Sequence, residues 1–208
     1  MAGRITIVGL GPGAPGHVTA ETLAAIDAVP AERRFLRTAR HPSAGLVTGA
    51  ATFDDVYEAA DSFDAVYAEI AERLVAATTA DGHVLYAVPG SPLVLERTVA
   101  HLRADDRVAT EVLSAVSFLD VAWARLGIDP VEAGVRLVDG HAFATAAAGV
   151  TGAVLVAHTH ADWVLSDIKL AIDDPTGAID TTPVVLLKGL GTDAELVVES
   201  TWAEMDHA

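Results

Sequence analysis

The sequence has 208 residues, of which 51% are hydrophobic, and it contains no cysteine. A chain of this length buries roughly 70% of its extended surface on folding, and the absence of cysteine excludes disulfides, a thiol nucleophile and thiolate metal ligands. The net charge of −16 argues against binding nucleic acid or an anionic membrane surface. We expect a cytoplasmic protein, because neither a signal peptide nor a membrane-spanning apolar run is recognisable.

Strand-like and helix-like segments alternate in the first half of the chain. The predicted strands are residues 5–8, 35–36, 83–88 and 108–113, and the predicted helices are one that begins after an N-cap at Thr19 and residues 63–78, 93–102 and 114–126. This β-α alternation predicts an α/β fold with a mainly parallel, doubly wound sheet and helices on both of its faces.

The pattern changes after about residue 113. Strand candidates follow at residues 135–138, 153–158, 184–187 and 196–198, and one long helix is predicted at residues 162–172. This predicts a second α/β subdomain with a mixed sheet that contains antiparallel strands. We therefore expect two subdomains, residues 1–113 and 114–208.

A glycine-rich loop follows the first predicted strand. Its glycines Gly11, Gly13 and Gly16 match the spacing of a dinucleotide-binding fingerprint. However, Pro12 disfavours the early helix start of that fingerprint, and Arg37 stands where a ribose-binding acid is expected. Two interpretations stay open, a tight turn between strand and helix, or a backbone wall that a ligand approaches closely.

A second loop of this kind, Gly90-Ser91-Pro92, follows the predicted strand 83–88. The carboxyl ends of parallel strands lie along one edge of a sheet, and open α/β sheets bind their ligands at that edge. Together the two loops predict a ligand-binding cleft.

The motifs of this chain resemble those of the tetrapyrrole methylases, the class III methyltransferases that use S-adenosylmethionine. Gly90-Ser91-Pro92 stands where that family has Gly-Asp-Pro, and Ser114-Ala115-Val116-Ser117 where it has Pro-Gly-Val/Ile-Thr/Ser. The other similar segments are Val8-Gly9-Leu10-Gly11-Pro12-Gly13 followed by Thr19, Thr182-Pro183-Val184, and Gly189-Leu190-Gly191-Thr192. The resemblance covers the whole chain.

Within that family the chain most resembles the methylase-like N-terminal domain fused to MazG-type nucleoside triphosphate pyrophosphohydrolases. The segments typical of that domain are Phe35-Leu36-Arg37-Thr38 with His41-Pro42, Phe53-Asp54-Asp55-Val56-Tyr57, Tyr86-Ala87-Val88-Pro89-Gly90, Ser117-Phe118-Leu119-Asp120, Leu126-Gly127-Ile128-Asp129-Pro130, Ser166-Asp167-Ile168-Lys169-Leu170 and Glu204-Met205-Asp206. This resemblance implies a MazG-type domain as a possible partner.

The resemblance implies two α/β halves with S-adenosylmethionine between them, a small-molecule methyl acceptor and a homodimer. It assigns Gly90, Ser91, Pro92, Ser117, Ala157, Pro183 and Gly191 to the cofactor side, and Gly9, Gly11, Pro12, Gly13 and Arg37 to the wall of a substrate trough. Methyl transfer from a sulfonium depends mainly on proximity and alignment, so no catalytic residue is assigned. Because Ser91 and Ser114-Ala115 depart from the family motifs, the alternative is a non-catalytic, S-adenosylmethionine-binding regulatory module of a MazG-type pyrophosphohydrolase.

Three further groups of residues have a functional and a structural interpretation. The arginines Arg33, Arg34, Arg37 and Arg40 form either an anion site or, as we favour, a solvated face paired with acids such as Asp54 and Asp55. His158 and His160 lack a third placed ligand, so no metal site is predicted. Glu58, Asp61, Glu69 and Glu72 resemble magnesium-binding acids of pyrophosphohydrolases only in the reverse order, and we expect surface acids.

Overall fold

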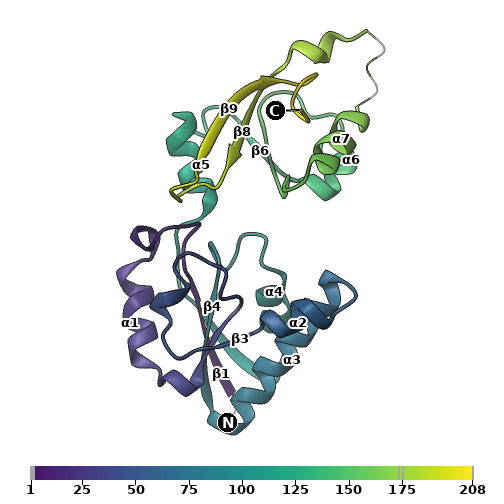
Figure 1. Cartoon of the computed structure of the whole chain (residues 1–208). Coiled ribbons are helices and arrows are strands. Elements are labelled where there is room, and N and C mark those ends of the chain that lie inside the picture. Colours follow the sequence, from purple (N-terminus) through teal and green to yellow (C-terminus); the bar gives the residue numbers. More distant parts are fainter. Residues whose placement is uncertain (1–2, 173, 175, 208) are drawn as a thin grey trace. The chain divides into compact units, whose positions relative to one another are not determined.

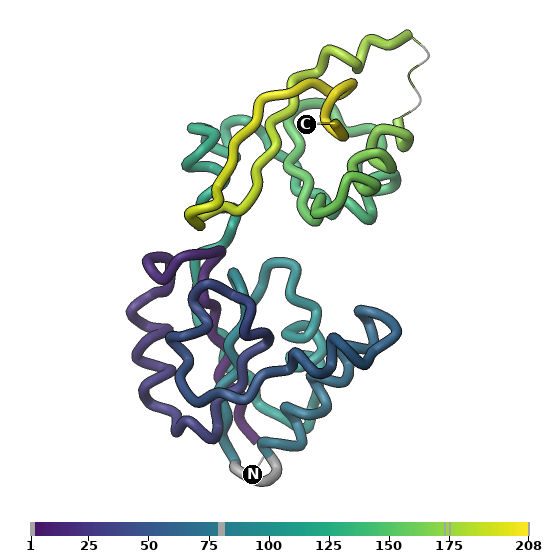
Figure 2. Tube along the Cα trace, in the orientation of Figure 1, coloured from purple at the N-terminus to yellow at the C-terminus, as the bar shows by residue number. Residues whose placement is uncertain are grey.

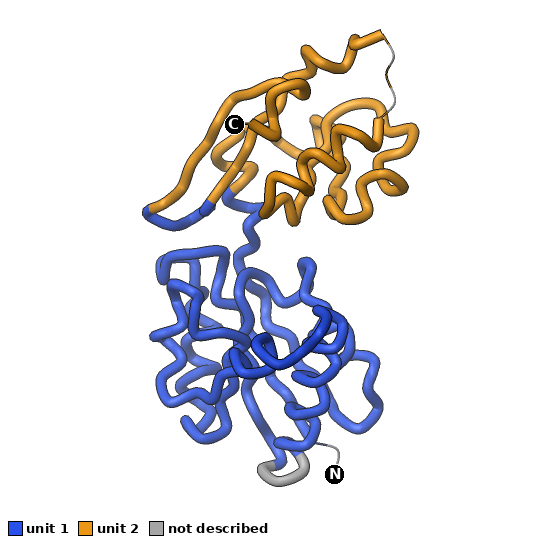
Figure 3. Tube along the Cα trace, turned by 45° about the vertical axis from the view of Figure 1, so that its right-hand side comes forward, with its two compact units in different colours: residues 1–121, 189–193 blue, residues 122–188, 194–208 orange. Residues whose placement is uncertain are grey.

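The computed structural model describes residues 3–172, 174 and 176–207, with the backbone alone for residues 79–81. The chain divides into two compact units, residues 1–121 with 189–193 and residues 122–188 with 194–208 (Figure 3). The boundary predicted after Leu113 falls inside the first unit. The chain stays packed in that unit beyond this point because Leu113 donates its N–H to the Ile7 carbonyl at 2.9 Å and the side chain of Val121 is buried.

The first unit contains one parallel sheet and the helices that cover it. Its elements are β1 (Gly3–Gly9), η1 (Pro15–His17), α1 (Ala20–Ala28), η2 (Ala31–Arg33), β2 (Arg34–Leu36), η3 (Ala44–Leu46), β3 (Ala51–Thr52), α2 (Asp54–Ala59), α3 (Phe63–Asp81), β4 (His83–Val88), α4 (Arg97–Arg103), β5 (Val108–Val112) and the start of α5 (Phe118–Leu126). The strand order is β3-β2-β4-β1-β5, and every pairing within this sheet is parallel. The predicted doubly wound α/β fold is confirmed.

Alternate residues of the central strands face two separate hydrophobic cores, as the period of a strand requires. On one face Ile5, Ile7 and Tyr86 pack with α2, α3 and α4, and on the other Val8 and Leu85 pack with α1. Figure 1 shows α1 on one side of β1 and β4 and the other three helices on the opposite side. Because both faces are covered, β1 and β4 each contain a buried, largely apolar run, residues 5–8 and 84–88, which is why they are recognisable in the sequence.

The helix starts follow their capping residues. α1 begins after Thr19, whose hydroxyl accepts from the Thr22 N–H at 3.1 Å, as predicted. The helix predicted at 93–102 begins only at Arg97, because Leu95 has a left-handed backbone (φ +57°) and Glu96 is the N-cap. The helix predicted at 114–126 likewise begins only at Phe118.

The second unit contains two small sheets. Its elements are the end of α5, β6 (Arg136–Asp139), η4 (Gly140–Ala142), α6 (Phe143–Ala146), β7 (Val154–Ala157), α7 (Asp162–Leu170), η5 (Ala178–Thr181), β8 (Pro183–Lys188) and β9 (Leu196–Thr201). β6 and β7 are parallel, whereas β8 and β9 form an antiparallel hairpin, visible as the two long yellow-green segments in Figure 2. The second half contains both parallel and antiparallel pairings, as predicted, but in two separate sheets and not in one mixed sheet.

Two segments that are distant in the sequence, α7 and the C-terminal turn, pack together in the core of the second unit. Met205 is buried with Val164 and Ile168 of α7. The Lys169 ammonium donates to the Asp206 carboxylate at 2.6 Å and to the Ala203 carbonyl at 2.5 Å. The C-terminal turn is therefore fixed to α7 by both apolar and charged contacts.

No helix in the described part of the chain is both long enough and apolar enough to cross a membrane.

Candidate functional site

The two predicted loops lie side by side at the carboxyl edge of the sheet in the first unit. One follows β1 and the other follows β4, and these strands are neighbours. An isolated antiparallel bridge joins Gly11 to Gly90. The joining hydrogen bonds are Gly90 N–H to Gly11 O (2.8 Å) and Leu10 N–H to Val88 O (2.9 Å). This edge is where open α/β sheets bind ligands.

Gly9 sits where three chain segments converge. A Cβ atom at this position would lie 2.3 Å from the Gly90 carbonyl oxygen, 2.5 Å from the Ala115 Cβ and 2.8 Å from the Pro92 Cδ. Such separations are far below van der Waals contact, so no larger residue fits without displacing these loops. Gly9 thus lets the loops after β4 and β5 close on the end of β1. The space beside it is filled by protein.

Gly90 has the opposite environment. Its backbone is left-handed, with φ of +67°, and an added Cβ would meet no atom within 4 Å. Ser91 beside it is partly exposed, whereas Pro92 is buried. The Ser91 carbonyl accepts from the Val94 N–H at 3.1 Å and closes a turn. Gly90 therefore presents open main chain at the edge of the sheet.

The rest of the glycine loop is held by protein contacts. A Cβ on Gly13 would lie 2.4 Å from the Gly191 carbonyl oxygen, and the Ala14 N–H donates to that oxygen at 2.8 Å. The Gly13 carbonyl accepts from the buried Ser43 hydroxyl at 2.7 Å. Gly191 therefore lies against this loop, together with the partly buried Pro12.

Two histidines support the same loop. The His17 ring packs closely against Gly191, and its backbone carbonyl lies beside Gly11. The His41 Nδ1 accepts from the Ser43 N–H at 3.2 Å. Burial lowers the pKa of His41, which favours its neutral form, although a hydrogen bond with the backbone of Gly11 acts in the opposite direction. These side chains belong to the loop's packing rather than to its open surface.

Arg37 follows β2 at the same edge, but its guanidinium is bound by other side chains. It forms an ion pair with Glu96 and donates from Nε to the Tyr57 hydroxyl at 2.6 Å. It also lies 5.3 Å from the centre of the Tyr67 ring. The side chains of Arg37 and Glu96 are only 18% and 2% exposed. Desolvation opposes the charge of Arg37, but the Glu96 carboxylate raises its pKa further, so Arg37 is a structural cation here.

Ser117 caps α5. Its N–H donates to the Asp120 carboxylate at 2.7 Å, while its hydroxyl accepts from the Leu119 N–H at 3.2 Å. This reciprocal arrangement is a capping box with aspartate in place of glutamate. It explains why the helix begins after Ser117 and not at Ser114.

The remaining cofactor-side predictions lie in the second unit. Ala157 is the last residue of β7 and is partly buried, and Pro183 is the exposed first residue of β8, paired with Thr201. Both residues belong to the second unit, whereas Gly90 belongs to the first.

The arginine-rich segment is largely structural. Arg34 donates to the Val29 carbonyl at 2.7 Å, and Arg40 lies 3.9 Å from Glu58 at the surface. Of the two acids expected to pair with the segment, Asp54 accepts from Thr38 and Ala39 within it and is stabilised by the charge of Arg40, whereas Asp55 pairs with Arg73.

The acids that resembled magnesium ligands are likewise exposed, and three of them lie beside arginines. Glu58 is 3.9 Å from Arg40, Glu69 binds Arg73, and Glu72 binds Arg107. Within the described residues, no group of three or more histidine, aspartate or glutamate side chains is placed to hold a metal ion.

Comparison with known proteins identifies the family. Residues 4–206 match the sequence profile of the tetrapyrrole (corrin/porphyrin) methylases. The chain belongs to this family.

A curated relative and solved structures agree with this assignment. The chain is 32% identical over 214 residues to the uncharacterized protein YabN of Bacillus subtilis, matching all of this chain but only 42% of that protein's length. Among solved structures, uroporphyrin-III C-methyltransferase from Thermus thermophilus is 20% identical with a TM-score of 0.68, over 99% of this chain and 86% of that one.

Two further solved structures extend the likeness. A Thermus thermophilus uroporphyrin-III C-methyltransferase complexed with S-adenyl homocysteine is 17% identical (TM-score 0.66, 99% and 86% covered). Diphthine synthase is 13% identical (TM-score 0.65, 99% and 84% covered). At these identities the likeness shows the tetrapyrrole methylase-like fold alone, and that fold is confirmed for this chain. Since the fold serves proteins with different names, it does not identify an acceptor.

Proposed function

We propose that this protein is a methyltransferase that uses S-adenosylmethionine and transfers the methyl group to a small-molecule acceptor. The observation that carries the proposal is the family match over residues 4–206. The open main chain of Gly90, held against the glycine loop by the Gly11 carbonyl, supports a cofactor contact at this position.

The residues of the first unit fit a cofactor that is recognised mainly through backbone atoms. Gly90 leaves room for close approach, and Ser91 adds a partly exposed hydroxyl beside it. Bound S-adenosylmethionine would supply a methyl group on a positively charged sulfur, and its leaving group departs neutral. The protein then needs to position donor and acceptor, and it needs no general acid. At this edge of the sheet the buried ionisable side chains of Arg37 and Glu96 are paired with each other. This pairing agrees with a reaction that needs no general acid from them.

A homodimer and the cofactor-side roles of Ser117, Gly191, Ala157 and Pro183 are part of this proposal. They rest on the resemblance of the motifs to the family. For Ser117 we propose a contact through its backbone carbonyl, which has a second lone pair, because its N–H and hydroxyl are both used to cap α5.

Calorimetric titration of the full chain with S-adenosylmethionine and S-adenosylhomocysteine tests the cofactor. We expect binding of both at micromolar to submillimolar concentration. Absence of heat at millimolar ligand would contradict the proposal. A transfer assay with radiolabelled cofactor and candidate acceptors then tests catalysis.

The alternative is a module that binds S-adenosylmethionine without transferring its methyl group, as part of a MazG-type nucleoside triphosphate pyrophosphohydrolase. Two observations favour it. The curated relative is far longer than this chain, which spans 42% of it, and Ser91 stands in place of the family's aspartate. Cofactor binding with no turnover over a broad acceptor panel would support this alternative. Release of pyrophosphate from a nucleoside triphosphate with magnesium would assign the hydrolase activity to this chain itself.

A further inference from the structure

Three large apolar side chains are exposed on the segments that surround the buried pair of Arg37 and Glu96. Phe63 is 65% exposed, Leu93 is 61% exposed and Leu95 is 41% exposed. The two leucines lie between β4 and α4, whereas Phe63 is the first residue of α3. We call the surface that carries these three side chains the apolar edge. The sequence motifs assign none of the three to a site.

Two sets of contacts bring the start of α3 beside the segment that precedes α4. The Phe63 ring stacks on the Tyr67 ring, with centres 6.3 Å apart. The Tyr67 ring centre lies 5.3 Å from the guanidinium of Arg37, which pairs with Glu96. Asp64 also accepts from the first residue of α4 at 2.6 Å. The exposed side chains of both segments therefore belong to one region of the first unit.

The apolar edge lies on the same loop as the proposed cofactor contact. Leu93 follows Gly90 by only three residues, between β4 and α4. Further along this loop, Leu95 has a φ of +57°, a left-handed conformation that residues with a side chain seldom adopt. Backbone strain that surrounding contacts maintain is concentrated at functional sites. A molecule bound to these leucines would be held close to one bound at Gly90, as methyl transfer requires.

The charges of this region are matched. The arginines of residues 37–41, 57–67 and 91–97 each have a carboxylate beside them, in the pairs Arg37–Glu96, Arg40–Glu58 and Arg97–Asp64. The exposed Asp61, two residues before α3 begins, adds a further negative charge. A ligand with several carboxylates or a phosphate would therefore meet competing acids and be repelled. The region offers apolar contact and an exposed phenyl ring instead.

We infer that the apolar edge binds the methyl acceptor, and that this acceptor is an uncharged, planar aromatic molecule. A planar ring stacks on an exposed phenyl ring, and contact with the leucine side chains removes further apolar surface from water. In the transfer, a lone pair on an acceptor nitrogen or oxygen forms the bond to the methyl carbon. The electron pair of the broken S–CH3 bond stays on sulfur, and the proton of an acceptor N–H or O–H passes to water. The inference rests on the proposed function, since only a transferase has an acceptor.

Calorimetric titration with two probes that share one ring system tests the inference. 2-Naphthol is planar and uncharged at pH 7, whereas 2-naphthoate has the same rings and a carboxylate. We expect 2-naphthol to bind the full chain at least tenfold more tightly than 2-naphthoate. This preference should persist in protein saturated with S-adenosylhomocysteine, because acceptor and cofactor have to be bound together.

A pair of leucine variants locates the probe. Leu93 lies in the apolar edge, whereas Leu170 is 82% exposed at the end of α7 in the second unit. We expect Leu93→Ala and Phe63→Ala each to weaken 2-naphthol binding at least fivefold, and Leu170→Ala to leave it unchanged. Phe63→Tyr keeps an aromatic ring and should retain most of the affinity. Urea midpoints of all four variants should stay near that of the wild type, because these side chains are exposed.

A charge variant tests the selection against anions. Asp64→Asn leaves the Arg97 guanidinium without its carboxylate. We expect this variant to bind 2-naphthoate at least threefold more tightly than the wild type at low ionic strength, with the affinity for 2-naphthol unchanged.

The outcomes separate this inference from the proposed function. If S-adenosylhomocysteine binds while 2-naphthol does not, or while it binds no more tightly than 2-naphthoate, the inference is overturned and the proposed function stands. Displacement of 2-naphthol by S-adenosylhomocysteine, or equal 2-naphthol affinity in Leu93→Ala, Phe63→Ala and the wild type, also overturns the inference alone. Absence of S-adenosylhomocysteine binding removes the proposed function, and the acceptor assignment with it.

Discussion

Arg37 and Glu96 form a buried ion pair that ties the end of β2 to the first turn of α4. Glu96 also caps this helix, because its carboxylate accepts from the Thr98 N–H at 3.2 Å. The Tyr57 hydroxyl accepts a further hydrogen bond from the Arg37 guanidinium. Burial raises the pKa of Glu96, and Arg37 opposes this shift. The loop that carries Gly90 and Ser91 is therefore fixed at one end by the bond to Gly11 and at the other by this pair.

Removing either partner leaves a buried, uncompensated charge. We expect Arg37→Met and Glu96→Gln each to lower the free energy of unfolding by about 3 kcal/mol. The double variant should lose less than the sum of the two, with a coupling of at least about 1.5 kcal/mol. Urea unfolding of the four proteins measures this cycle.

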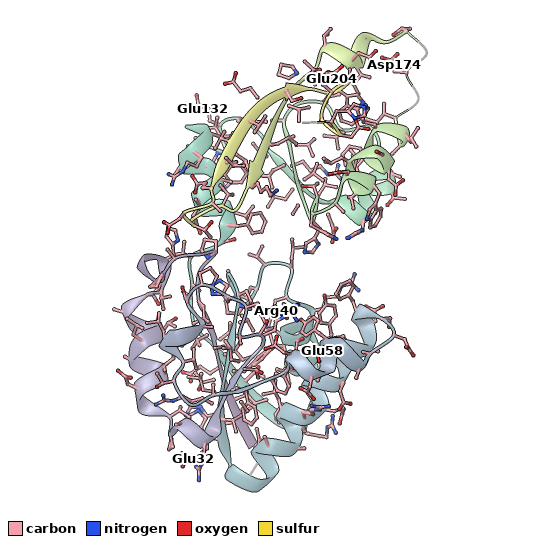
Figure 4. All side chains as sticks on the ribbon, viewed as in Figure 1. Glu32, Arg40, Glu58, Glu132, Asp174 and Glu204 are labelled. Carbon is pink, nitrogen blue, oxygen red and sulfur yellow. The ribbon has the colours of Figure 1, made fainter. Side chains whose placement is uncertain are left out.

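The exposed pair of Arg40 and Glu58 is the control for this cycle. Both side chains lie at the surface of the first unit in Figure 4, 79% and 73% exposed and 3.9 Å apart. A cycle with Arg40→Met and Glu58→Gln should show coupling below roughly 0.5 kcal/mol. Equal coupling in the two cycles would show that burial does not strengthen the Arg37–Glu96 pair.

A methyl group at Gly90 should block ligand without unfolding the protein. Gly90→Ala places its Cβ in open space, so we expect a loss of about 1 kcal/mol from the left-handed backbone alone. If the cofactor approaches this main chain, affinity for S-adenosylhomocysteine should fall at least tenfold. Calorimetry and urea unfolding of the same protein separate the two effects.

Two other glycines make this test specific. Gly82 also has open space and a left-handed backbone (φ +75°), but it precedes β4 at the opposite edge of the sheet. Gly82→Ala should therefore cost similar stability and leave affinity unchanged. Gly9→Ala should destabilise by at least 2 kcal/mol, because its Cβ would overlap the Gly90 carbonyl. Equal ligand affinity of wild type and Gly90→Ala would remove Gly90 from the cofactor site.

Much of the fold was predictable because its signals are local. β1 contains a short β-branched run and β4 a short apolar run, both buried on both faces, and Thr19 is a recognisable cap. The start of α4 was predicted too early because the apolar pattern begins at Leu93, and the left-handed backbone of Leu95 has no signal in that pattern. The start of α5 was also predicted too early. The Ser117–Asp120 capping pattern was a local signal that could have corrected α5.

The candidate site was predictable only in part. Neighbouring parallel strands place the loops of Gly11 and Gly90 together, which follows from topology. The partner of Arg37 lies 59 residues away in sequence, so no spacing rule reveals that this arginine is already bound. The position of His141 was not predictable for the same reason. Its ring lies beside those of His158, at the end of β7, and Trp163, at the start of α7, which are further along the chain.

The hydrogen bonds of Asp54 predict how the free energy of unfolding changes at low pH. Its carboxylate accepts from the Ala39 N–H at 2.9 Å and the Thr38 hydroxyl at 2.6 Å, and these bonds lower its pKa below the usual 3.8. A lowered folded-state pKa stabilises the protein above pH 3.8, and this contribution is lost as the pH falls through the folded-state value. Asp54→Asn should lower the free energy of unfolding by roughly 1 kcal/mol at pH 7.

The difference between wild type and Asp54→Asn should then shrink as the pH falls from 4 to 2. Thr38→Val removes one of these donors and should show a smaller difference with the same sign. Urea unfolding at several pH values measures both. A constant difference between wild type and Asp54→Asn over this range would show that the carboxylate charge is not responsible.

The capping box at the start of α5 separates a structural role of Ser117 from a binding role. Ser117→Ala and Asp120→Ala each remove one of the two reciprocal hydrogen bonds, so each should cost about 1 kcal/mol in urea unfolding. Because we assign the cofactor contact of Ser117 to its backbone, Ser117→Ala should bind S-adenosylhomocysteine within twofold of the wild type. Ser117→Thr keeps the hydroxyl and should restore most of the stability. A tenfold loss of affinity in Ser117→Ala that is absent in the equally destabilised Asp120→Ala would assign the hydroxyl itself to the ligand.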